Sequence, residues 1–212
     1  MGAIRVVESS KLDIEKIYFE ANKGSIVGGI MVQDRAKLTG KKLDCYGNSA
    51  TDRASAVFYT GDSIGFLDDA MFEGLERDDD LRDFLVSDDF DRNKLEDYKL
   101  ARAGAVEVDS RTFVSLSEAI FKKNSAMYGA VISSGQAVLD IRFSHFDENL
   151  ALNGAGVYVE GGRGSYARVM TSHFNNNVAN NGGALVVAGN DCSPPWLNSH
   201  DLCSRQWHIC DR

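Results

Sequence analysis

Proline, cysteine and long apolar runs are all scarce in this chain of 212 residues. Both prolines, Pro194 and Pro195, stand near the C-terminal end, and strands that pair on both sides tolerate few prolines because they need their N–H groups. No run approaches the roughly 20 apolar residues that a membrane helix needs, and the first residues lack the basic and apolar regions of a signal peptide. The formal net charge of −8 argues against a nucleic-acid partner, which requires a basic face. We therefore expect an ordered domain with no membrane span and no nucleic-acid partner.

What the sequence has in plenty is internal repetition. One phrase recurs: an aromatic residue, two residues, an asparagine, about five residues, and a pair of small residues before a short apolar strand. Four copies are clear and two are weaker, and their aromatic slots are Phe19, Cys45, Phe72, Phe121, Phe146 and Phe174. Successive small pairs are 27, 49, 25, 25 and 28 residues apart, and the long interval exceeds the others by about 23 residues. We interpret this excess, about 76–99, as an insertion within one repeat.

Each repeat is typical of three short strands separated by Gly, Ser and Asn turns, because apolar and polar residues alternate within it. A unit of about 25 residues cannot bury its apolar face alone. Six similar units therefore predict a solenoid in which each strand pairs with its counterpart one turn later, about 4.8 Å away. The aromatic slots then form an internal ladder, in which Cys45 is a buried free thiol.

The asparagine slots predict a second ladder, placed at a turn of the solenoid. Asparagine tolerates left-handed backbone angles there, and its amide can bond the neighbouring turns. The predicted members of this ladder are Asn22, Asn48, Asn124, Asn149 and Asn177.

The F-x-x-N and G-G-A-[ILV] pattern resembles the repeats of chlamydial polymorphic outer-membrane proteins and of related right-handed parallel β-helix (pectin-lyase-like) proteins. The resemblance covers roughly 17–189 apart from the insertion, and it is strongest over 121–187, where three consecutive copies stand. It implies an adhesin-like passenger region at the cell surface or outside the cell. We therefore predict an all-β fold, a single-stranded right-handed parallel β-helix of about six turns over 1–189. Since we find neither a secretion signal nor an anchor, we expect a fragment or a distant relative with a different setting.

The negative charge is concentrated in and beside the insertion. Between Asp68 and Lys99, thirteen acids face five bases, so this segment carries the whole net charge of −8. Leu81, Phe84 and Leu85 have helical spacing, which predicts a short helix lying on the solenoid. We interpret the rest of the acidic segment as a solvated, partly mobile excursion.

Some parallel β-helix proteins are carbohydrate-active enzymes, so clustered acids in the repeats could be catalytic. One repeat carries Asp140, Arg142, Asp147 and Glu148, but the next repeat has no acids in the equivalent slots. A hydrolase would need carboxylates on adjacent turns of one face, and a lyase would need a calcium-binding acid cluster with a base. We therefore predict solvated strand faces here and no catalytic residues.

Two patterns could ligate a metal. His145 and His173 each precede an aromatic slot and should share one row, but two imidazoles are few ligands, and we interpret them as surface residues. The segment that begins at Asp89 starts like an EF-hand calcium loop, yet Lys94 and Leu100 replace the required glycine and glutamate. Weak calcium binding elsewhere in the acidic segment remains an alternative. We predict no metal and no cofactor.

The repeat ends after Gly189, and residues 190–212 form a Cys- and Trp-containing tail. Its cysteines could form one disulfide and leave an odd thiol. Together with its two histidines they could instead bind zinc, although their spacing matches no standard finger. We favour a third interpretation, a poorly packed end. The residues concerned are Cys192, His200, Cys203, His208 and Cys210.

The predicted function is a non-catalytic β-helix repeat module, a surface-interaction or adhesin-like region of a larger protein with a glycan or protein ligand on the solenoid face. The alternative is a fragment of a carbohydrate-active enzyme, a polysaccharide lyase or glycoside hydrolase whose site lies on turns outside this chain. A third hypothesis is a structural repeat that only adds length. Because neither end shows a convincing polar cap, we also expect end-to-end self-association or membership of something longer.

Overall fold

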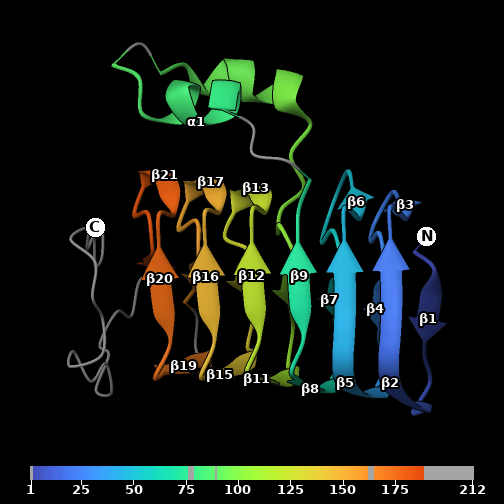
Figure 1. Cartoon of the computed structure of the whole chain (residues 1–212). Coiled ribbons are helices and arrows are strands. Elements are labelled where there is room, and N and C mark those ends of the chain that lie inside the picture. The colour runs from blue at the N-terminus through green and yellow to red at the C-terminus, as the bar shows by residue number, and fades with distance from the viewer. Residues whose placement is uncertain (1, 76–78, 89, 162–164, 189–212) are drawn as a thin grey trace.

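The computed structural model describes residues 2–75, 79–88, 90–161 and 165–188, and the chain winds into a parallel β-solenoid of about seven turns (Figure 1). Strands pair in parallel with their counterparts on adjacent turns, as at Phe121 and Phe146. The parallel β-solenoid predicted from the repeats is confirmed, with one turn more than expected. The additional turn starts at β1 (Ile4–Val6), which follows the small pair Gly2-Ala3 and which the repeat count omits because no aromatic slot precedes it.

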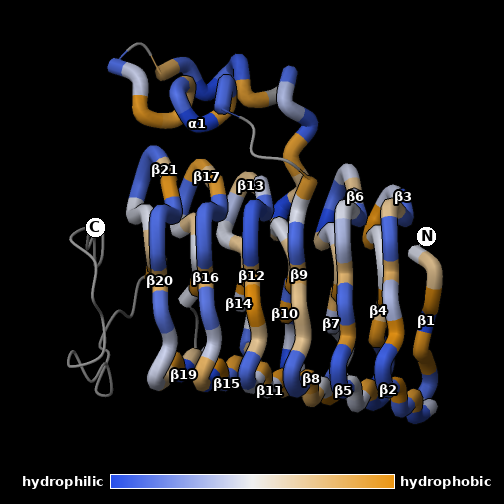
Figure 2. The backbone as a smooth tube through the Cα atoms, in the orientation of Figure 1, coloured by the Kyte–Doolittle hydropathy of each residue, from blue (hydrophilic) through white to orange (hydrophobic). Residues whose placement is uncertain are grey.

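A seven-stranded sheet lies behind the long strands of Figures 1 and 2. Its strands are short because a pair of small residues precedes each one and a turn follows after three or four residues. In spatial order they are β1, β4 (Ile30–Val32), β7 (Val57–Tyr59), β10 (Val106–Val108), β14 (Val131–Ser133), β18 (Val157–Glu160) and β22 (Leu185–Ala188).

A ten-stranded sheet forms the front and the lower edge in Figure 1. β2 (Lys11–Glu20) and β5 (Lys37–Tyr46) each run through it as ten-residue strands. Lys16 and Lys42 have left-handed angles within these strands, and on later turns the equivalent residues, such as Glu118 and Phe143, stand between two separate strands. The divided pairs are β8 (Ile64–Asp68) and β9 (Met71–Glu73), β11 (Phe113–Ser117) and β12 (Ile120–Lys122), β15 (Val138–Arg142) and β16 (His145–Asp147), and β19 (Tyr166–Met170) and β20 (His173–Asn175).

A second left-handed corner lies beside the asparagine slots. The residue with positive φ is the one that precedes the asparagine, for example Lys123 at 53° and Glu148 at 56°. The prediction that the ladder asparagines themselves take left-handed angles is therefore wrong. The preceding residue makes the corner, which leaves each asparagine amide free to bond along the solenoid axis.

Short strands close several of the turns at the top of Figure 1. β3 (Lys23–Gly24) pairs with β6 (Ser49–Ala50), and a three-stranded sheet contains β13 (Ser125–Tyr128), β17 (Leu150–Asn153) and β21 (Val178–Asn181). The insertion covers this second sheet with α1 (Asp79–Leu85) and a 3₁₀ helix, η1 (Arg92–Tyr98). The helix predicted on the solenoid is present.

The inner face of the insertion is packed rather than solvated. Leu81 and Leu85 of α1 are fully buried and form an apolar cluster with Leu150 and Leu152 of β17. Asn180 Nδ2 also donates to the Leu85 carbonyl oxygen at 3.1 Å. This packing is the one that the predicted helix on the solenoid requires, because its leucines bury apolar surface that β17 would otherwise expose.

The interior of the solenoid is apolar along its whole length, and Figure 2 shows hydrophobic positions alternating with polar ones along the strands. Inward residues fall in rows because the register is kept from turn to turn, as for Val32, Tyr59 and Val108. Of the helices in the described ranges, none has the length and apolar character that crossing a bilayer requires.

Candidate functional site

The predicted aromatic slots lie in register inside the solenoid. Phe72, Phe121, Phe146 and Phe174 stack with ring centroids 4.9, 4.7 and 4.7 Å apart and interplanar angles of 11°, 8° and 5°. Offset or parallel ring contacts add to the apolar burial of each ring. The stack therefore fixes the spacing of the turns that carry the outer faces.

The asparagine slots form hydrogen-bonded ladders. Asn149 Nδ2 donates to Asn177 Oδ1 at 2.8 Å and to the Phe121 carbonyl oxygen at 3.0 Å, and Asn149 Oδ1 accepts from the Asn124 backbone N–H at 3.0 Å. Asn22 and Asn48 make a separate pair of the same kind at 3.0 Å. The ladder is interrupted between Asn48 and Asn124, because Leu75 occupies the intervening slot where the insertion leaves the solenoid.

The aromatic ladder is interrupted at Cys45, which lies between Phe19 and Phe72. This thiol is free and buried, and burial, with a smaller contribution from the charge of Asp44, raises its pKa to about 12. A thiol with such a pKa stays protonated near neutral pH and is a poor nucleophile. The structure therefore gives Cys45 a packing role.

Tyr59 is an irregular member of the inward row, fully buried between Val32 and Val108. Its ring lies over Gly65, where an added Cβ would stand 2.5 Å from Tyr59 Cε1. Gly65 is thus required by the close approach of this ring rather than by its backbone angles.

Gly65→Ala is expected to lower the free energy of unfolding by about 1–3 kcal/mol, because the methyl group overpacks the core against Tyr59. In Gly65→Ala/Tyr59→Val, valine would match the residues on the adjacent turns and make room for the methyl group. Urea unfolding of the wild type, both single variants and the double variant should show a coupling of about 1 kcal/mol or more. Purely additive losses would contradict this contact.

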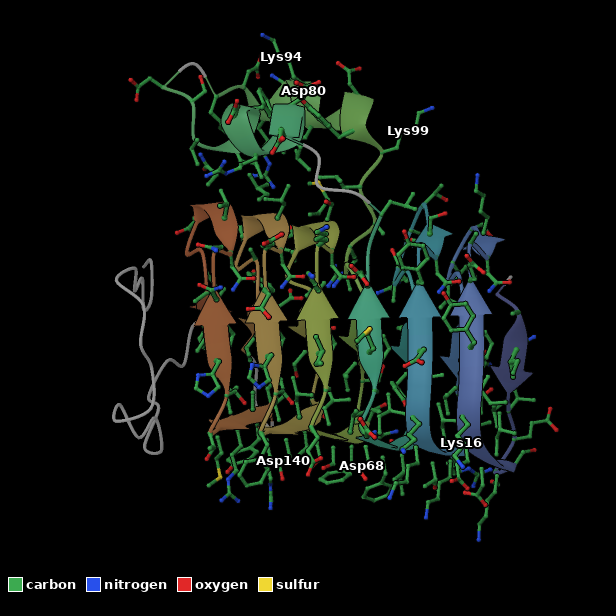
Figure 3. The ribbon with its side chains drawn as sticks, in the orientation of Figure 1. Lys16, Asp68, Asp80, Lys94, Lys99 and Asp140 are labelled. Carbon is green, nitrogen blue, oxygen red and sulfur yellow. The ribbon has the colours of Figure 1, made fainter. Side chains whose placement is uncertain are left out.

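The acids considered for catalysis lie on outer faces. Arg142 Nε donates to both carboxylate oxygens of Asp140 at 3.1 and 2.9 Å, and Figure 3 shows Asp140 and Asp68 at the lower edge of the solenoid, directed away from it. The next turn places Arg168 in register with Asp140, so no second acid stands in the equivalent slot of that turn.

The histidine rings of His145 and His173 stack at 5.0 Å on exposed positions of β16 and β20. No group of three or more His, Cys, Asp or Glu side chains suited to a metal occurs among the described residues. Asp91 Oδ1 instead accepts from Asn93 N and Nδ2, each at 3.0 Å. Asp89, the first residue of the rejected EF-hand pattern, and the tail, residues 190–212, for which a disulfide, a zinc site and a poorly packed end were considered, lie outside the described residues.

An open hollow of about 390 Å³ lies on the outer side of the seven-stranded sheet, at the ends of β10, β14 and β18. We call it the arginine hollow. Its lining residues are Arg53, Arg102, Asp109, Ser134, Gly135, Glu160 and Gly161.

Two arginines one turn apart form the lip of the hollow. Arg53 and Arg102 occupy equivalent positions, because the alanines that follow them, Ala54 and Ala103, form a parallel bridge. Each guanidinium also lies over an aromatic ring, Arg53 over Phe58 at 5.2 Å and Arg102 over Tyr128 at 5.5 Å. These contacts hold two positive charges side by side, so a counter-charge is needed.

Glu107 supplies that counter-charge from beneath. Val106 and Val108 pack in the core, so Glu107 between them points outward, and its side chain is fully buried under the arginines. Its Oε1 accepts from Arg53 Nη1 at 2.8 Å and from Arg102 Nε at 3.1 Å. Burial raises the pKa of the Glu107 carboxyl above its ordinary value, and its hydrogen bond to Arg53 and the two positive charges offset only part of this effect.

A polar row forms the floor of the hollow on three successive turns. Asp109, Ser134 and Glu160 follow the registered residues Val108, Ser133 and Val159. Ser134 Oγ donates to Asp109 Oδ1 at 3.1 Å, and Arg102 Nη2 lies 3.3 Å from Glu160 Oε2. The hollow thus presents fixed donors and acceptors on both sides, which can bind a polar ligand without being reordered.

The stability of the protein should depend on pH through Glu107. Its raised pKa means that the folded state holds this proton more tightly than the unfolded state, where the pKa is about 4.3. The stabilisation of the folded state by this proton is therefore fully present below about pH 4.3, and it is lost as pH rises through the pKa of Glu107 in the folded state. Glu107→Gln removes this titration. The free energy of unfolding of the wild type minus that of Glu107→Gln, measured in urea, should fall with rising pH; a constant or rising difference would contradict the assignment.

Arg53, Arg102 and Glu107 were not predicted from the sequence. A signal for the first two is present, because the segments R-A-S-A-V from Arg53 and R-A-G-A-V from Arg102 differ at one position. Comparison of this chain with protein-family models, with curated proteins and with solved structures finds no match.

Proposed function

We propose that this chain is a non-catalytic β-helix module that recognises a ligand on its outer face, as an adhesin-like region of a larger protein at the cell surface or outside the cell. The observation that carries the proposal is the arginine hollow. Arg53 and Arg102 are held by Glu107 below and by aromatic rings beside them, so their orientation is set before a ligand arrives. Pre-organised groups of this kind lower the entropic cost of binding.

The position of Glu107 favours recognition over catalysis. A raised carboxyl pKa is a perturbation that catalytic acids use. Glu107, however, is fully buried beneath two arginines, and a general acid has to reach the proton-accepting atom of its substrate. Its role is to position the arginines. The F-x-x-N and G-G-A-[ILV] repeats support the adhesin-like setting through their resemblance to polymorphic outer-membrane proteins.

An array of cell-surface glycans and extracellular-matrix proteins tests this proposal with the purified chain. We expect retention on a subset of spots, reduced about tenfold or more by Arg53→Gln/Arg102→Gln, since charged hydrogen bonds contribute about 1.5–3 kcal/mol each. Arg111→Gln is the matched control, because Arg111 pairs with Asp62 on an exposed part of the solenoid outside the hollow. Circular dichroism verifies the fold of each variant.

Recovered ligands distinguish a recognition module from an enzyme. Mass spectrometry of a ligand after incubation with the chain should find it unchanged. We call Arg53→Gln/Arg102→Gln the hollow variant. Cleavage or elimination products that the wild type forms and the hollow variant does not would show that the chain is a carbohydrate-active enzyme and would contradict this proposal. Retention that is equal in wild type and hollow variant would show that the hollow is not the recognition site.

A further inference from the structure

We infer that the arginine hollow takes a neutral, hydroxyl-rich ligand, a stretch of uncharged oligosaccharide, in preference to an anion. The inference rests on the proposed function, since it names the ligand class of the same hollow. Two adjacent arginines would by themselves suggest a carboxylate, sulfate or phosphate ligand. The carboxylates around the two arginines, however, disfavour an anionic ligand.

The positive charge of the hollow is already compensated. Arg53 and Arg102 carry two positive charges, and three carboxylates face them. Two minus three leaves one negative charge when all five groups are ionised, and none when Glu107 is protonated. An incoming anion would therefore have to displace an existing carboxylate partner and approach the others. The compensating carboxylates are Glu107, Asp109 and Glu160.

The lining chemistry matches vicinal hydroxyl groups. A hydroxyl can donate to a carboxylate and accept from a guanidinium at the same time, and the hollow presents carboxylates on its floor opposite guanidinium groups on its lip. Every described side chain that lines it is charged or hydroxylated, and the remaining lining residues, Gly135 and Gly161, have no side chain. Apolar ligands would leave these polar groups unpaired, which is costly.

The spacing favours an extended ligand that lies along the solenoid axis. Asp109, Ser134 and Glu160 stand on three successive turns, and Arg53 and Arg102 stand on two, so both rows repeat about every 4.8 Å. A ligand with hydroxyl groups at regular intervals would meet a polar side chain, a carboxylate or a hydroxyl, on each of the three turns. The volume of about 390 Å³ lies within the usual range for small-molecule sites.

Calorimetric titration of the full chain with a panel of uncharged oligosaccharides (gluco-, manno-, galacto- and xylo-) tests the ligand class, with inorganic sulfate and an oligogalacturonate as anionic probes. At least one uncharged oligosaccharide should bind, and Arg53→Gln/Arg102→Gln should weaken it about tenfold or more. Binding should change little with ionic strength, because no ion pair with the ligand is formed.

Glu160→Gln separates the two ligand classes and leaves Glu107 and its arginines in place. Glu160 is half-exposed, so the variant should fold like the wild type. A neutral ligand loses a charged acceptor and should bind about threefold to tenfold more weakly. An anion loses a repulsive neighbour and should bind more tightly. Binding of sulfate or oligogalacturonate that strengthens in Glu160→Gln and weakens with salt would overturn the inference.

Failure of this inference can be told apart from failure of the proposed function. If every oligosaccharide fails at millimolar concentration while an array protein is retained through the hollow, the ligand class is wrong and the recognition module stands. If nothing is retained through the hollow in either experiment, both are wrong.

Discussion

Asn149→Ala is expected to lower the free energy of unfolding by about 3–4 kcal/mol. Asn149 is fully buried, and its amide nitrogen donates to Asn177 and to the Phe121 carbonyl oxygen. Its Oδ1 accepts from both the backbone and the side chain of Asn124. Alanine removes these side-chain bonds and takes away the partner of the Phe121 carbonyl oxygen and of the buried Asn124 N–H, whereas Asn177 Oδ1 keeps the backbone N–H of residue 149. Each buried group left without a partner costs about 1–3 kcal/mol.

Asn175→Ala is the matched control, because Asn175 lies on the next turn with an exposed side chain. Its substitution should change the free energy of unfolding by no more than about 0.5 kcal/mol. Urea unfolding followed by circular dichroism measures both variants. Equal effects of the two substitutions would mean that the ladder bonds do not hold the turns together.

Phe146→Ala is expected to cost about 3–5 kcal/mol, the usual range for a fully buried phenylalanine. The Phe146 ring stacks between those of Phe121 and Phe174, at 4.7 Å from each. Its removal leaves a cavity inside the solenoid, and the rigid rings on both sides cannot move together because the strands above and below keep their register.

Phe143→Ala provides the comparison for the ring itself. Phe143 stands three residues earlier on the same turn, and its side chain is 55% exposed. The substitution should change the midpoint of urea unfolding little, whereas Phe146→Ala should move it strongly. A larger effect at Phe143 would indicate that the inward and outward faces of this turn are assigned the wrong way round.

The parts of the fold that the sequence predicts are those that recur. A ladder residue contacts its own counterpart on the next turn, so the same residue type is favoured at a fixed interval, and the interval is visible without knowledge of the fold. Phe121, Phe146 and Phe174 with Asn124, Asn149 and Asn177 are the clearest case. Gly65 shows the opposite case, because the ring that requires it lies on another strand and belongs to no repeated position.

The repeated phrase did not reveal the arginine hollow, because Arg53 and Arg102 stand at positions of the phrase whose residue type varies between copies. Arg53 and Arg102 occupy equivalent positions, yet the insertion separates them in sequence, so their spacing differs from that of the other turns. Glu107 stands where Phe58 and Ile132 stand on adjacent turns, and a single acid among apolar residues gives no pattern. Its partners become apparent only when the turns are stacked.

In the insertion, the sequence predicts the helix but not the surface that the helix covers. The interval between Leu81 and Leu85 predicts the helix, since helical periodicity is a local property. The surface that this helix covers depends on Leu150 and Leu152, which are distant in sequence. Acidic composition indicated a solvated segment, but it describes only the outer side of the helix, on which Figure 3 shows Asp80.

We propose that recognition takes place at the arginine hollow and not on another face of the solenoid. Array retention of three variants tests it most directly: Arg53→Gln/Arg102→Gln in the hollow, Phe66→Ala on the lower face, and His145→Asn/His173→Asn on the front face. We predict that only the hollow variant loses retention, by about tenfold or more. Loss in either of the other variants, with retention unchanged in the hollow variant, would contradict the claim.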